Sequence, residues 1–544
     1  WALDKEDLVN SKARHIHEYC YDDCKVLFED FNYIKKLYIQ LLPIVGKVLN
    51  DYHGVSWGSR SFKVVYGMWL HDYLPVMRER YQTVSSAIKS YPSHSFILTK
   101  QKFNIHSSKE FKEKITQDDY NHFIYTKIVK FISNTTYDQS HFLSSNNHQF
   151  SLTHSYTNRI KLKLKDSIIK KLQIFINFST KKSLAVVDRS YFSISDFFKL
   201  IKNSKRKITP LIYFPKTNKD KAIFSFSTRV KLKEKLKKEY SPQNRFEEFI
   251  INNIFYDAPL SFIENFNQLI NESRIIKLRD KNYLSSNAIL SNQVLQFAVA
   301  SQMKSRNKLI IPQHGGSYGI ARWSSQQFWE TDMADVFISF GWVEDDRSNI
   351  LPLSHPKLIL NSRENAQGSK KVLYITNGSS RYFNRNWAHP SAGKSTIRYY
   401  KYMMKFIQNL NPLVKDNLYL RLSPSVEDYG LDVRTFLNNC IKLSDGNFYK
   451  ELLSSALIVC DHNQTSFLES LANNIPTIFF WDSKYTQISN KAKPYFDELM
   501  TQGIFYTSPS KAADCINTLI NNNSISEWWM DGQRQAAIAS FTKQ

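Results

Sequence analysis

The stretch KKVLYITNG, residues 370–378, joins a short apolar run to a loop of small polar residues. A helical segment follows at 396–411. Further strand-like runs and helical segments alternate after it: LYLRLSP (418–424), a helix at 432–440, ALIVCD (456–461), a helix at 465–474 and PTIFFWD (476–482). Such alternation is typical of a parallel sheet with crossover helices. We therefore predict a doubly wound α/β domain over residues 370–525, closed by a helical tail at 526–544.

The same alternation lies upstream of this domain. Helical patterns at 246–255 and 292–307 precede the strand-like runs KLIIPQ (308–313) and DVFISFG (335–341). These segments predict a second Rossmann-like lobe, spanning residues 1–360.

An irregular stretch at about 100–245 interrupts the N-terminal lobe. It is rich in Lys, Asn and Ser, and it contains strand-like runs at 171–179 and 222–227. We interpret it as a helical and irregular insertion. Residues 361–370, which show no apolar periodicity, are predicted to link the two lobes.

The charge balance restricts the class of partner. The chain has 73 Lys and Arg against 49 Asp and Glu, a net charge of +24, which favours anionic partners. No RNA-binding motif or zinc-finger spacing is present, so nucleic acid is not expected. Lysine-rich runs lie at 161–165, 170–171, 181–182 and 231–238. They form either solvated faces or a patch for an anionic membrane, and both interpretations stay open.

Five scattered cysteines, an odd number, argue for a reducing compartment and against a disulfide framework. No uninterrupted apolar run approaches the ~20 residues of a spanning helix. We expect a cytoplasmic protein, with peripheral attachment to the inner face of the plasma membrane left open. The start on Trp1 instead of Met predicts that the natural N-terminus lies upstream. No metal and no cofactor are expected.

Strand-end loops of the C-terminal domain carry the residue types that bind nucleotides. Ligands of open parallel sheets bind beyond the carboxyl ends of the strands. A phosphate is predicted at two such places, the small-residue loop after the first strand and the helix start that follows ALIVCD. An arginine at the end of LYL could clamp a diphosphate, and a glutamate inside the helix could accept from ribose hydroxyls. The predicted residues are Asn377, Gly378, Ser379, Arg421, Thr465, Ser466 and Glu469, with His389 as a further candidate. An ordinary helix cap and a surface arginine are the alternatives.

The N-terminal lobe offers IPQHGGSYG, residues 311–319, at another strand end. Gln313 and His314 precede two glycines that permit a tight turn with exposed amides. A neutral histidine here could transfer a proton, and Glu330 is a carboxylate for the same site. A turn histidine and a helix-end charge are the structural alternatives.

The chain contains no P-loop, GxGxxG, GxSxG or HExxH motif. Two Rossmann-like lobes facing across a cleft, with a sugar nucleotide in the C-terminal lobe, match the GT-B layout by analogy of fold.

Several motifs in order give the chain a family resemblance. These are HGVSW…RERY (53–81), DDYNHFIYTKI (118–128), IPQHGGSYG with the downstream ADVFISFGW, and NQTSFLESLANNIPTIFFW (463–481). Together they resemble bacterial surface-carbohydrate transferases related to the retaining β-Kdo transferases of O-antigen and capsule assembly.

The resemblance implies a metal-independent GT-B enzyme that uses CMP-Kdo as donor and retains the anomeric configuration. Retention implies an enzyme carboxylate that captures the sugar before the acceptor hydroxyl displaces it. By resemblance, the reaction centre holds Gln313, His314 and Glu330, and the nucleotide lies at Thr465, Ser466 and Glu469. Where the carboxylate is expected, the sequence has Asn287. Asp280, seven residues earlier, is a weak substitute.

The leading hypothesis is therefore a glycosyltransferase that moves Kdo, or another acidic sugar, to a surface polysaccharide or its lipid-linked precursor. Its partners would be the nucleotide sugar, the glycan acceptor, and proteins of a polysaccharide-assembly complex. Two alternatives stay open: a CDP-polyol-dependent polyol-phosphate transferase, and an inactive glycan- or membrane-binding scaffold.

Overall fold

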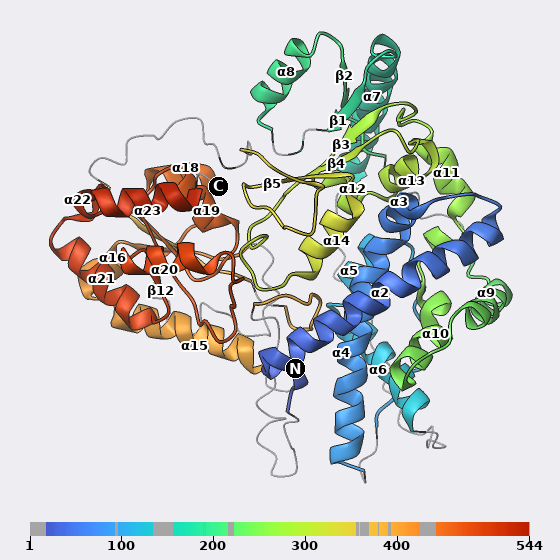
Figure 1. Ribbon diagram of the computed structural model, residues 1–544, viewed down its shortest axis with the longest axis horizontal. Coiled ribbons are helices and arrows are strands. Elements are labelled where there is room, and N and C mark those ends of the chain that lie inside the picture. Colours follow the sequence, from blue (N-terminus) through green and yellow to red (C-terminus); the bar gives the residue numbers. More distant parts are fainter. Residues whose placement is uncertain are drawn as a thin grey trace. The chain divides into compact units, whose positions relative to one another are not determined.

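The computed structural model describes residues 18–92, 96–133, 156–188, 190, 192–215, 222–354, 358, 369–378, 380–389, 393–423 and 442–542. The chain divides into two compact units, which we describe separately (Figure 1). Unit 1 comprises residues 1–32, 313–328 and 338–544, and unit 2 comprises 33–312 and 329–337.

The first sheet has the order β2-β1-β3-β4-β5-β6. The registers given for β1 to β4 are all parallel. The strands are β1 (Ala185–Asp188), β2 (Ile208–Leu211), β3 (Asn282–Leu284), β4 (Leu309–Pro312), β5 (Val336–Ser339) and β6 (Ile350–Pro352). The strand β2 lies on one side of β1, and the later strands follow on the other side. The topological switch point of this sheet is therefore between β1 and β3.

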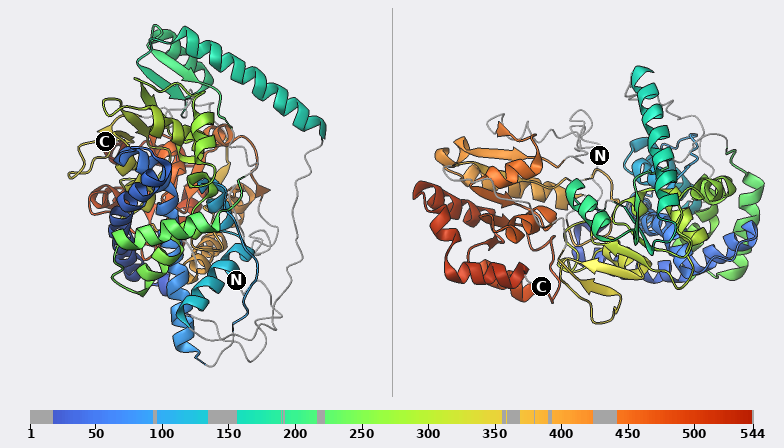
Figure 2. Two further views of the ribbon diagram at one scale, coloured as in Figure 1. Left: turned by 90° about the vertical axis from the view of Figure 1, so that its right-hand side faces the viewer. Right: turned by 90° about the horizontal axis from the view of Figure 1, so that it is seen from above.

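Helices make up most of unit 2 (Figures 1 and 2). The longer helices that lie wholly or partly in unit 2 are α2 (Cys24–His53), α4 (Met68–Ser90), α6 (Asp118–Ile132), α7 (Tyr156–Ser179), α8 (Ile194–Asn203), α9 (Phe226–Glu239), α10 (Arg245–Asp257), α11 (Phe266–Ser273), α13 (Gln293–Gln302) and α14 (Ser325–Met333). The first residues of α2 and α14 belong to unit 1. The sequence places polar caps at several starts: Ser193, Ser225, Asn244 and Asn292 each accept the amide hydrogen bond of the residue three positions on.

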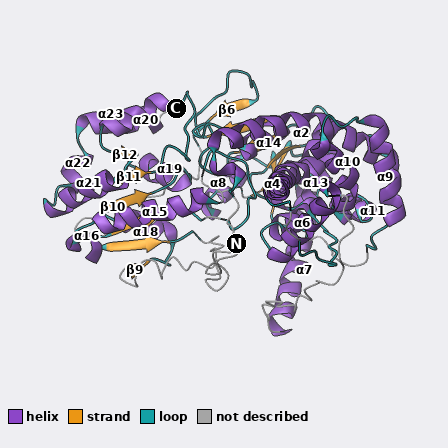
Figure 3. Cartoon of the chain, turned by 90° about the horizontal axis from the view of Figure 1, so that it is seen from below, coloured by secondary structure: helices purple, strands orange, loops and turns teal. Residues whose placement is uncertain are grey.

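Unit 1 is built on a second sheet, with the order β12-β11-β10-β7-β8-β9 and parallel pairing throughout (Figure 3). The strands are β7 (Val372–Ile375), β8 (Leu418–Arg421), β9 (Lys442–Leu443), β10 (Leu457–Cys460), β11 (Thr477–Phe480) and β12 (Phe505–Tyr506). Chain order runs outward from β7 in one direction and from β10 in the other. The switch point therefore lies between β7 and β10.

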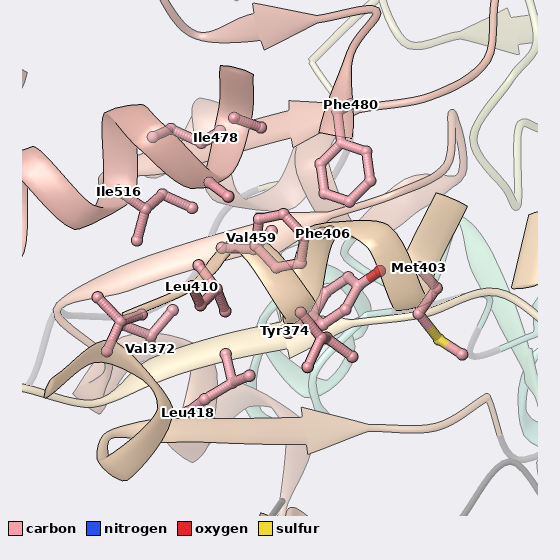
Figure 4. Close-up of a cluster of buried hydrophobic side chains, with 14 of the residues drawn as sticks. Val372, Tyr374, Met403, Phe406, Leu410, Leu418, Val459, Ile478, Phe480 and Ile516 are labelled. Carbon is pink, nitrogen blue, oxygen red and sulfur yellow. The ribbon is translucent and has the colours of Figure 1, made fainter. Parts of the chain in front are cut away.

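Side chains of β7 alternate between two apolar clusters, one on each face of the sheet. Val372 and Tyr374 belong to one cluster, and Leu373 and Ile375 belong to the other. Figure 4 shows Phe406 of α15 (Lys394–Asn409) against Tyr374 of the first cluster, with ring centroids 5.1 Å apart. Two-sided burial is what a parallel sheet covered by helices requires.

The remaining helices of unit 1 are α16 (Pro412–Asp416), α18 (Phe448–Ser454), α19 (Thr465–Ala472), α20 (Lys493–Thr501), α21 (Pro509–Asn521), α22 (Ile525–Trp529) and α23 (Gly532–Thr542). The last two form the tail of the chain. Trp529, Ala537 and Ile538 are buried in the cluster that contains Leu373. Trp529 Nε1 donates to Asn474 Oδ1 at 2.8 Å.

The two sheets confirm the predicted fold class, α/β with two doubly wound Rossmann-like domains. The division of the chain is more interleaved than the predicted lobes of 1–360 and 370–525, because residues 18–32, 313–328 and 338–354 belong to unit 1. The predicted linker at 361–370 lies outside the described residues except for its last two, and the predicted helix at 432–440 lies wholly outside them.

The stretch predicted as an insertion at about 100–245 supplies β1 and β2 of the first sheet. Two strand predictions inside it are wrong. Residues 171–179 are helical, in α7, because their apolar side chains recur at helical spacing. Residues 222–227 run from a loop into α9, where Ser225 acts as a helix cap. Among the described residues, no helix combines the length and apolarity needed to cross a bilayer.

Candidate functional site

The switch point of unit 1 brings two predicted loops together. The strand β7 pairs with β10 in parallel, with Ile375 opposite Cys460. Thr376 and Asn377 therefore leave the sheet beside Asp461. Crevices at this position are where doubly wound sheets bind their ligands.

Asp461 ties these two strand ends together. Its carboxylate accepts hydrogen bonds from Tyr374 Oη at 2.7 Å and from Tyr399 Oη at 2.9 Å. Tyr399 Oη in turn accepts the amide hydrogen of Asn377 at 2.8 Å. Burial raises the pKa of Asp461 to about 7, against the lowering effect of the two hydroxyls. Asp461 therefore fixes the geometry of the loop that starts at Asn377.

Two buried histidines lie next to this network. Burial lowers the pKa of His389 to about 3 and that of His462 to about 4, so both rings are neutral near pH 7. His462 Nδ1 accepts the amide hydrogen of Gln464 at 3.1 Å, which orders the turn before α19.

His389 presents a hydrogen-bond donor with no partner among the described residues. Asn377 Nδ2 donates to His389 Nε2 at 2.5 Å, so the proton of the neutral ring is on Nδ1. His389 is only 6 % exposed, and its Nδ1 is buried with no hydrogen-bond partner in the described part of the chain. A buried donor of this kind indicates a place for a ligand acceptor atom.

The histidine-glycine loop packs on the start of α19. The amide of Gly316 donates to Thr465 Oγ1 at 2.8 Å. A Cβ atom on Gly316 would lie 2.3 Å from the carbonyl carbon of Gln464 and 2.4 Å from the amide nitrogen of Thr465. Only glycine permits this approach of two backbones. The loop predicted for the reaction centre and the helix start predicted for the nucleotide are therefore in contact, within unit 1.

Gln313 holds the shape of this loop. It is fully buried, and its Nε2 donates to the carbonyl of Gly315 at 2.7 Å. Its Oε1 accepts from the amide of Phe340 at 3.0 Å and from Trp342 Nε1 at 2.7 Å. With these three bonds Gln313 positions its neighbours.

His314 follows, half-buried, at the tip of the loop. Its Nε2 lies 3.4 Å from Gln326 Nε2, and its ring meets the edge of Tyr318 at 5.8 Å. Ser317 has a φ of 69°, a left-handed conformation that is strained for a residue with a side chain. The structure therefore bends the chain sharply just after the two glycines.

The other residues predicted to contact a nucleotide are spread over the same edge of the sheet. Ser466 is half-buried beside Thr465, and Glu469 is buried one turn further along α19, where Tyr449 Oη donates to its Oε1 at 3.4 Å. Gly378 follows Asn377 and is half-buried. The predicted contact Ser379 lies outside the described residues.

Arg421, predicted as an anion clamp, already has a carboxylate partner. Its Nη1 lies 2.8 Å from Glu451 Oε2 and donates to the carbonyl of Gly446 at 2.9 Å. Lys371 Nζ lies 3.5 Å from the other oxygen of Glu451. An anionic ligand at Arg421 would have to compete with Glu451.

Three residues that the sequence analysis considered for a catalytic carboxylate, or for its position, belong to unit 2. Glu330 is fully buried on α14. Asn287, expected at the position of a carboxylate, is exposed at the start of the short helix α12 (Ala288–Ser291). Asp280 is exposed and pairs with Lys304 at 2.8 Å and with Arg306.

A carboxylate that sequence reasoning missed lies at the switch point of unit 2. Asp188 ends β1, and the register Val187↔Leu284 places it beside Ser285 of the segment that precedes Asn287. It is buried, and it accepts hydrogen bonds from Ser190 Oγ and, at 3.4 Å, from Tyr283 Oη. Burial raises its pKa above the usual range.

Ser286 lies next to Asp188 and its partner Ser190. Its amide donates to Ser190 Oγ at 2.8 Å, and its own Oγ is buried without a hydrogen-bond partner among the described residues. The signal in the sequence was the run AVVD at 185–188, an apolar strand that ends in an acid. The Lys-rich surroundings of this run predict an insertion instead of a strand of the sheet.

Within the described ranges, no three His, Cys, Asp or Glu side chains are grouped so as to hold a metal ion.

Comparison with known proteins gives one clear result and several distant ones. No curated protein matches the chain. The S. aureus MnaA–UDP co-structure is 11 % identical, covers 65 % of this chain and 92 % of its own, and has a TM-score of 0.36. A structure of a variant of the wall teichoic acid polymerase TagF is 14 % identical, covers 72 % of this chain and 93 % of its own, and has a TM-score of 0.34. The model of the LIC12162 family of transferases, in contrast, matches residues 1–544. The chain therefore belongs to the LIC12162 transferase family.

Proposed function

We propose that this protein is a glycosyltransferase that binds a nucleotide-activated sugar at the switch point of unit 1, with CMP-Kdo as the leading donor. Membership of a transferase family supports the reaction class. The observation that carries the proposal is the hydrogen bond from the Gly316 amide to Thr465 Oγ1, because it joins the histidine-glycine loop to a helix start.

The nucleotide phosphate would lie at the first turn of α19. Its N-terminal amides and the positive end of its dipole favour an anion. The N-cap Gln464 makes no side-chain capping bond there. The donor on His389 Nδ1 is a second group that an oxygen of the ligand can satisfy. Glu469 would accept from ribose hydroxyls, as the sequence predicted.

The sugar-capturing carboxylate that retention needs would be Asp188. Asn287 cannot serve as a nucleophile, and Asp280 is exposed and held by two cations. In the proposed step, an oxygen of Asp188 bonds to the anomeric carbon while the bond from that carbon to the phosphate oxygen breaks and CMP leaves. The acceptor hydroxyl then displaces the carboxylate and gives its proton to a general base. His314 in unit 1 keeps its predicted role in proton transfer as a separate proposal.

Isothermal titration with CMP, CDP, UDP and GDP tests the donor site. We expect CMP to bind most tightly, and binding of none of the four would reject the proposal. Glu469→Ala should weaken CMP binding about tenfold, the loss of one or two hydrogen bonds. Glu498→Ala, on the exposed side of α20, is the matched control and should bind as the unaltered protein does.

Glu330→Gln tests the predicted catalytic role of Glu330. This variant should keep nucleotide binding and lower turnover, because the nucleotide would be held by unit 1 and Glu330 lies in unit 2. Unchanged turnover would remove Glu330 from the mechanism.

A polyol-phosphate transferase that uses a CDP-polyol donor is the second candidate. The exposed amide of Asn287, where an acid was expected, favours it, since phosphate transfer needs no carboxylate that captures a sugar. Product analysis separates the two, because one activity forms a glycosidic bond and the other a phosphodiester. The third reading, an inactive scaffold, is rejected by any measurable donor hydrolysis.

A further inference from the structure

Helix α7 attaches to its unit through polar side chains. Gln173 is fully buried: its Nε2 donates to the carbonyl of Pro210 at 3.1 Å, and its Oε1 accepts the amide hydrogen of Ile212 at 2.8 Å. One turn later, Asn177 Nδ2 donates to the carbonyl of Ile275 at 3.2 Å. These bonds fix the C-terminal half of α7 beside β2, and Figure 2 shows the long helix running outward from there.

The opposite face of α7 is apolar and exposed. Ile168 is 65 % exposed, Leu172 48 %, Phe175 66 % and Phe178 80 %. Their spacing of four, three and three residues places them on one stripe of the helix. A surface helix of a globular protein ordinarily buries such a stripe and exposes its polar residues, so α7 has the reverse arrangement.

The charge around this stripe has one sign. Residues 167–182 contain four lysines and no acidic residue. Lys170 and Lys171 are exposed within the helix, and Lys181 and Lys182 are exposed just after its end. A face that combines large apolar side chains with unopposed lysines is complementary to an apolar layer bordered by negative charge.

We propose that this α7 surface, defined as Ile168, Leu172, Phe175 and Phe178 with the four lysines, docks on an anionic lipid membrane. The apolar side chains enter the boundary between head groups and acyl chains, and the lysines contact the anionic head groups. The helix lies in the plane of the membrane, since Gln173 and Asn177 keep its other face on the protein. Docking through α7 requires neither donor nor acceptor and is independent of the transferase proposal.

Another protein or a nucleic acid fits the surface less well. A nucleic acid would use the lysines and an aromatic ring but gains nothing from Ile168 and Leu172. A protein partner would have to be acidic and apolar at once over the same stripe, whereas an anionic bilayer supplies both properties over any area.

Flotation of the full chain with vesicles tests the charge contribution. We expect binding to vesicles of phosphatidylcholine with phosphatidylglycerol, and much weaker binding to phosphatidylcholine alone. The variant with Lys170→Gln and Lys171→Gln should partition about 10- to 30-fold more weakly, at roughly a fewfold per lysine. Lys237→Gln with Lys238→Gln, an exposed pair on α9, is the control with the same loss of charge. An equal loss in both pairs would overturn the assignment to α7.

The apolar contribution needs its own pair of variants. Phe178→Ser should weaken vesicle binding about tenfold or more, from the lost burial of one aromatic side chain. Met530→Ser, at an exposed position of unit 1, should have no effect. Because both residues are exposed, neither change should disturb folding, which circular dichroism verifies.

Hydrogen exchange locates the contact. Amides of residues 167–179 should become protected when anionic vesicles are added. If they do not, the membrane proposal is wrong. It is also wrong if Phe178→Ser abolishes self-association measured by sedimentation and leaves vesicle binding intact, because the surface then binds a second copy of the chain.

Discussion

The amide of Gly316 donates a hydrogen bond of 2.8 Å to Thr465 Oγ1, across 149 positions of sequence. Gly316 belongs to a tight loop and Thr465 to the first turn of a helix, so this single bond holds two pieces of backbone in register. The proposed donor site depends on that contact, and the first two predictions test it.

Gly316→Ala should destabilise unit 1 and remove nucleotide binding. The new Cβ would overlap the backbone of Gln464 and Thr465, which cannot move as a flexible side chain would. Overpacking of this kind costs about 1–3 kcal/mol. Urea unfolding and titration with CMP measure the two effects.

Gly315→Ala is the control for that experiment. Nothing lies within 4 Å of its ideal Cβ, and its φ is not in the left-handed region. The variant should keep the stability and the nucleotide affinity of the unaltered chain. Equal damage by both substitutions would mean that the loop tolerates no change at all, and would remove the special role of the Gly316 contact.

Thr465→Val removes the hydroxyl and keeps the shape of the side chain. The amide of Gly316 then loses its acceptor, which should lower the free energy of unfolding by about 1–3 kcal/mol. Thr518→Val on the exposed side of α21 removes a hydroxyl that bonds only to the preceding turn, and should change stability by less than ~0.5 kcal/mol. If the two valine variants unfold at the same urea concentration, the bond contributes little.

Asp461→Asn should steepen the loss of stability in acid. His389 and His462 have folded pKa values of about 3 and 4, so the unfolded chain binds two more protons as pH falls below 6.5. Asp461 acts in the opposite direction: its folded pKa of about 7 lies above 3.8, so the folded chain binds one more proton over the same window.

Asp461→Asn therefore removes the extra proton that the folded chain binds at Asp461, and only the extra protons of the unfolded chain at the two histidines remain. Between about pH 4 and pH 6.5, the slope of the unfolding free energy against pH should rise by about 1.4 kcal/mol per pH unit relative to the unaltered chain. Urea titrations at several pH values measure it. A parallel pair of curves would show that Asp461 titrates as an ordinary carboxyl.

Asp188→Asn should abolish turnover and spare nucleotide binding. Asp188 is buried at the switch point of unit 2, and the nucleotide would be held by unit 1. An amide keeps the hydrogen-bond acceptor for Ser190 but cannot capture a sugar. Asp280→Asn, at an exposed ion pair of the same unit, should retain turnover. The reverse result, with Asp280 essential and Asp188 dispensable, would exchange their assignments.

Local pattern predicted much of unit 1 correctly. Strands such as β7 and β10 are short apolar runs that end in small polar residues, and the helices between them have clear periodicity, so their order follows from sequence alone. The same logic placed His314 and Thr465 at strand ends. It could not show that His389 and His462 are buried, or that His389 contacts Asn377, because both depend on how a long loop folds back.

The same reasoning predicted the strands and the acidic residue of unit 2 less well, for physical reasons. Residues 171–179 are rich in Ile and Phe, which favour strands, but their apolar side chains recur at helical spacing, and hydrogen bonds of Gln173 and Asn177 fix the resulting helix on its unit. Asp188 ends a strand of four residues that lies within a Lys-rich stretch, and the composition of that stretch predicts an insertion instead of a sheet strand.

The N-terminal segment of unit 1 sets a condition on biosynthesis. The ring of Tyr21 packs on Phe383 with centroids 5.0 Å apart, and Asp22 accepts the amide hydrogen of Lys394 at 2.7 Å. At a ribosomal rate of ~5–20 residues per second, Phe383 is synthesised roughly 20–70 s after Tyr21. A gene fragment that begins at the second sheet would leave the surface around Phe383 uncovered, and expression of that half alone should require residues 18–32 to be supplied as a separate peptide.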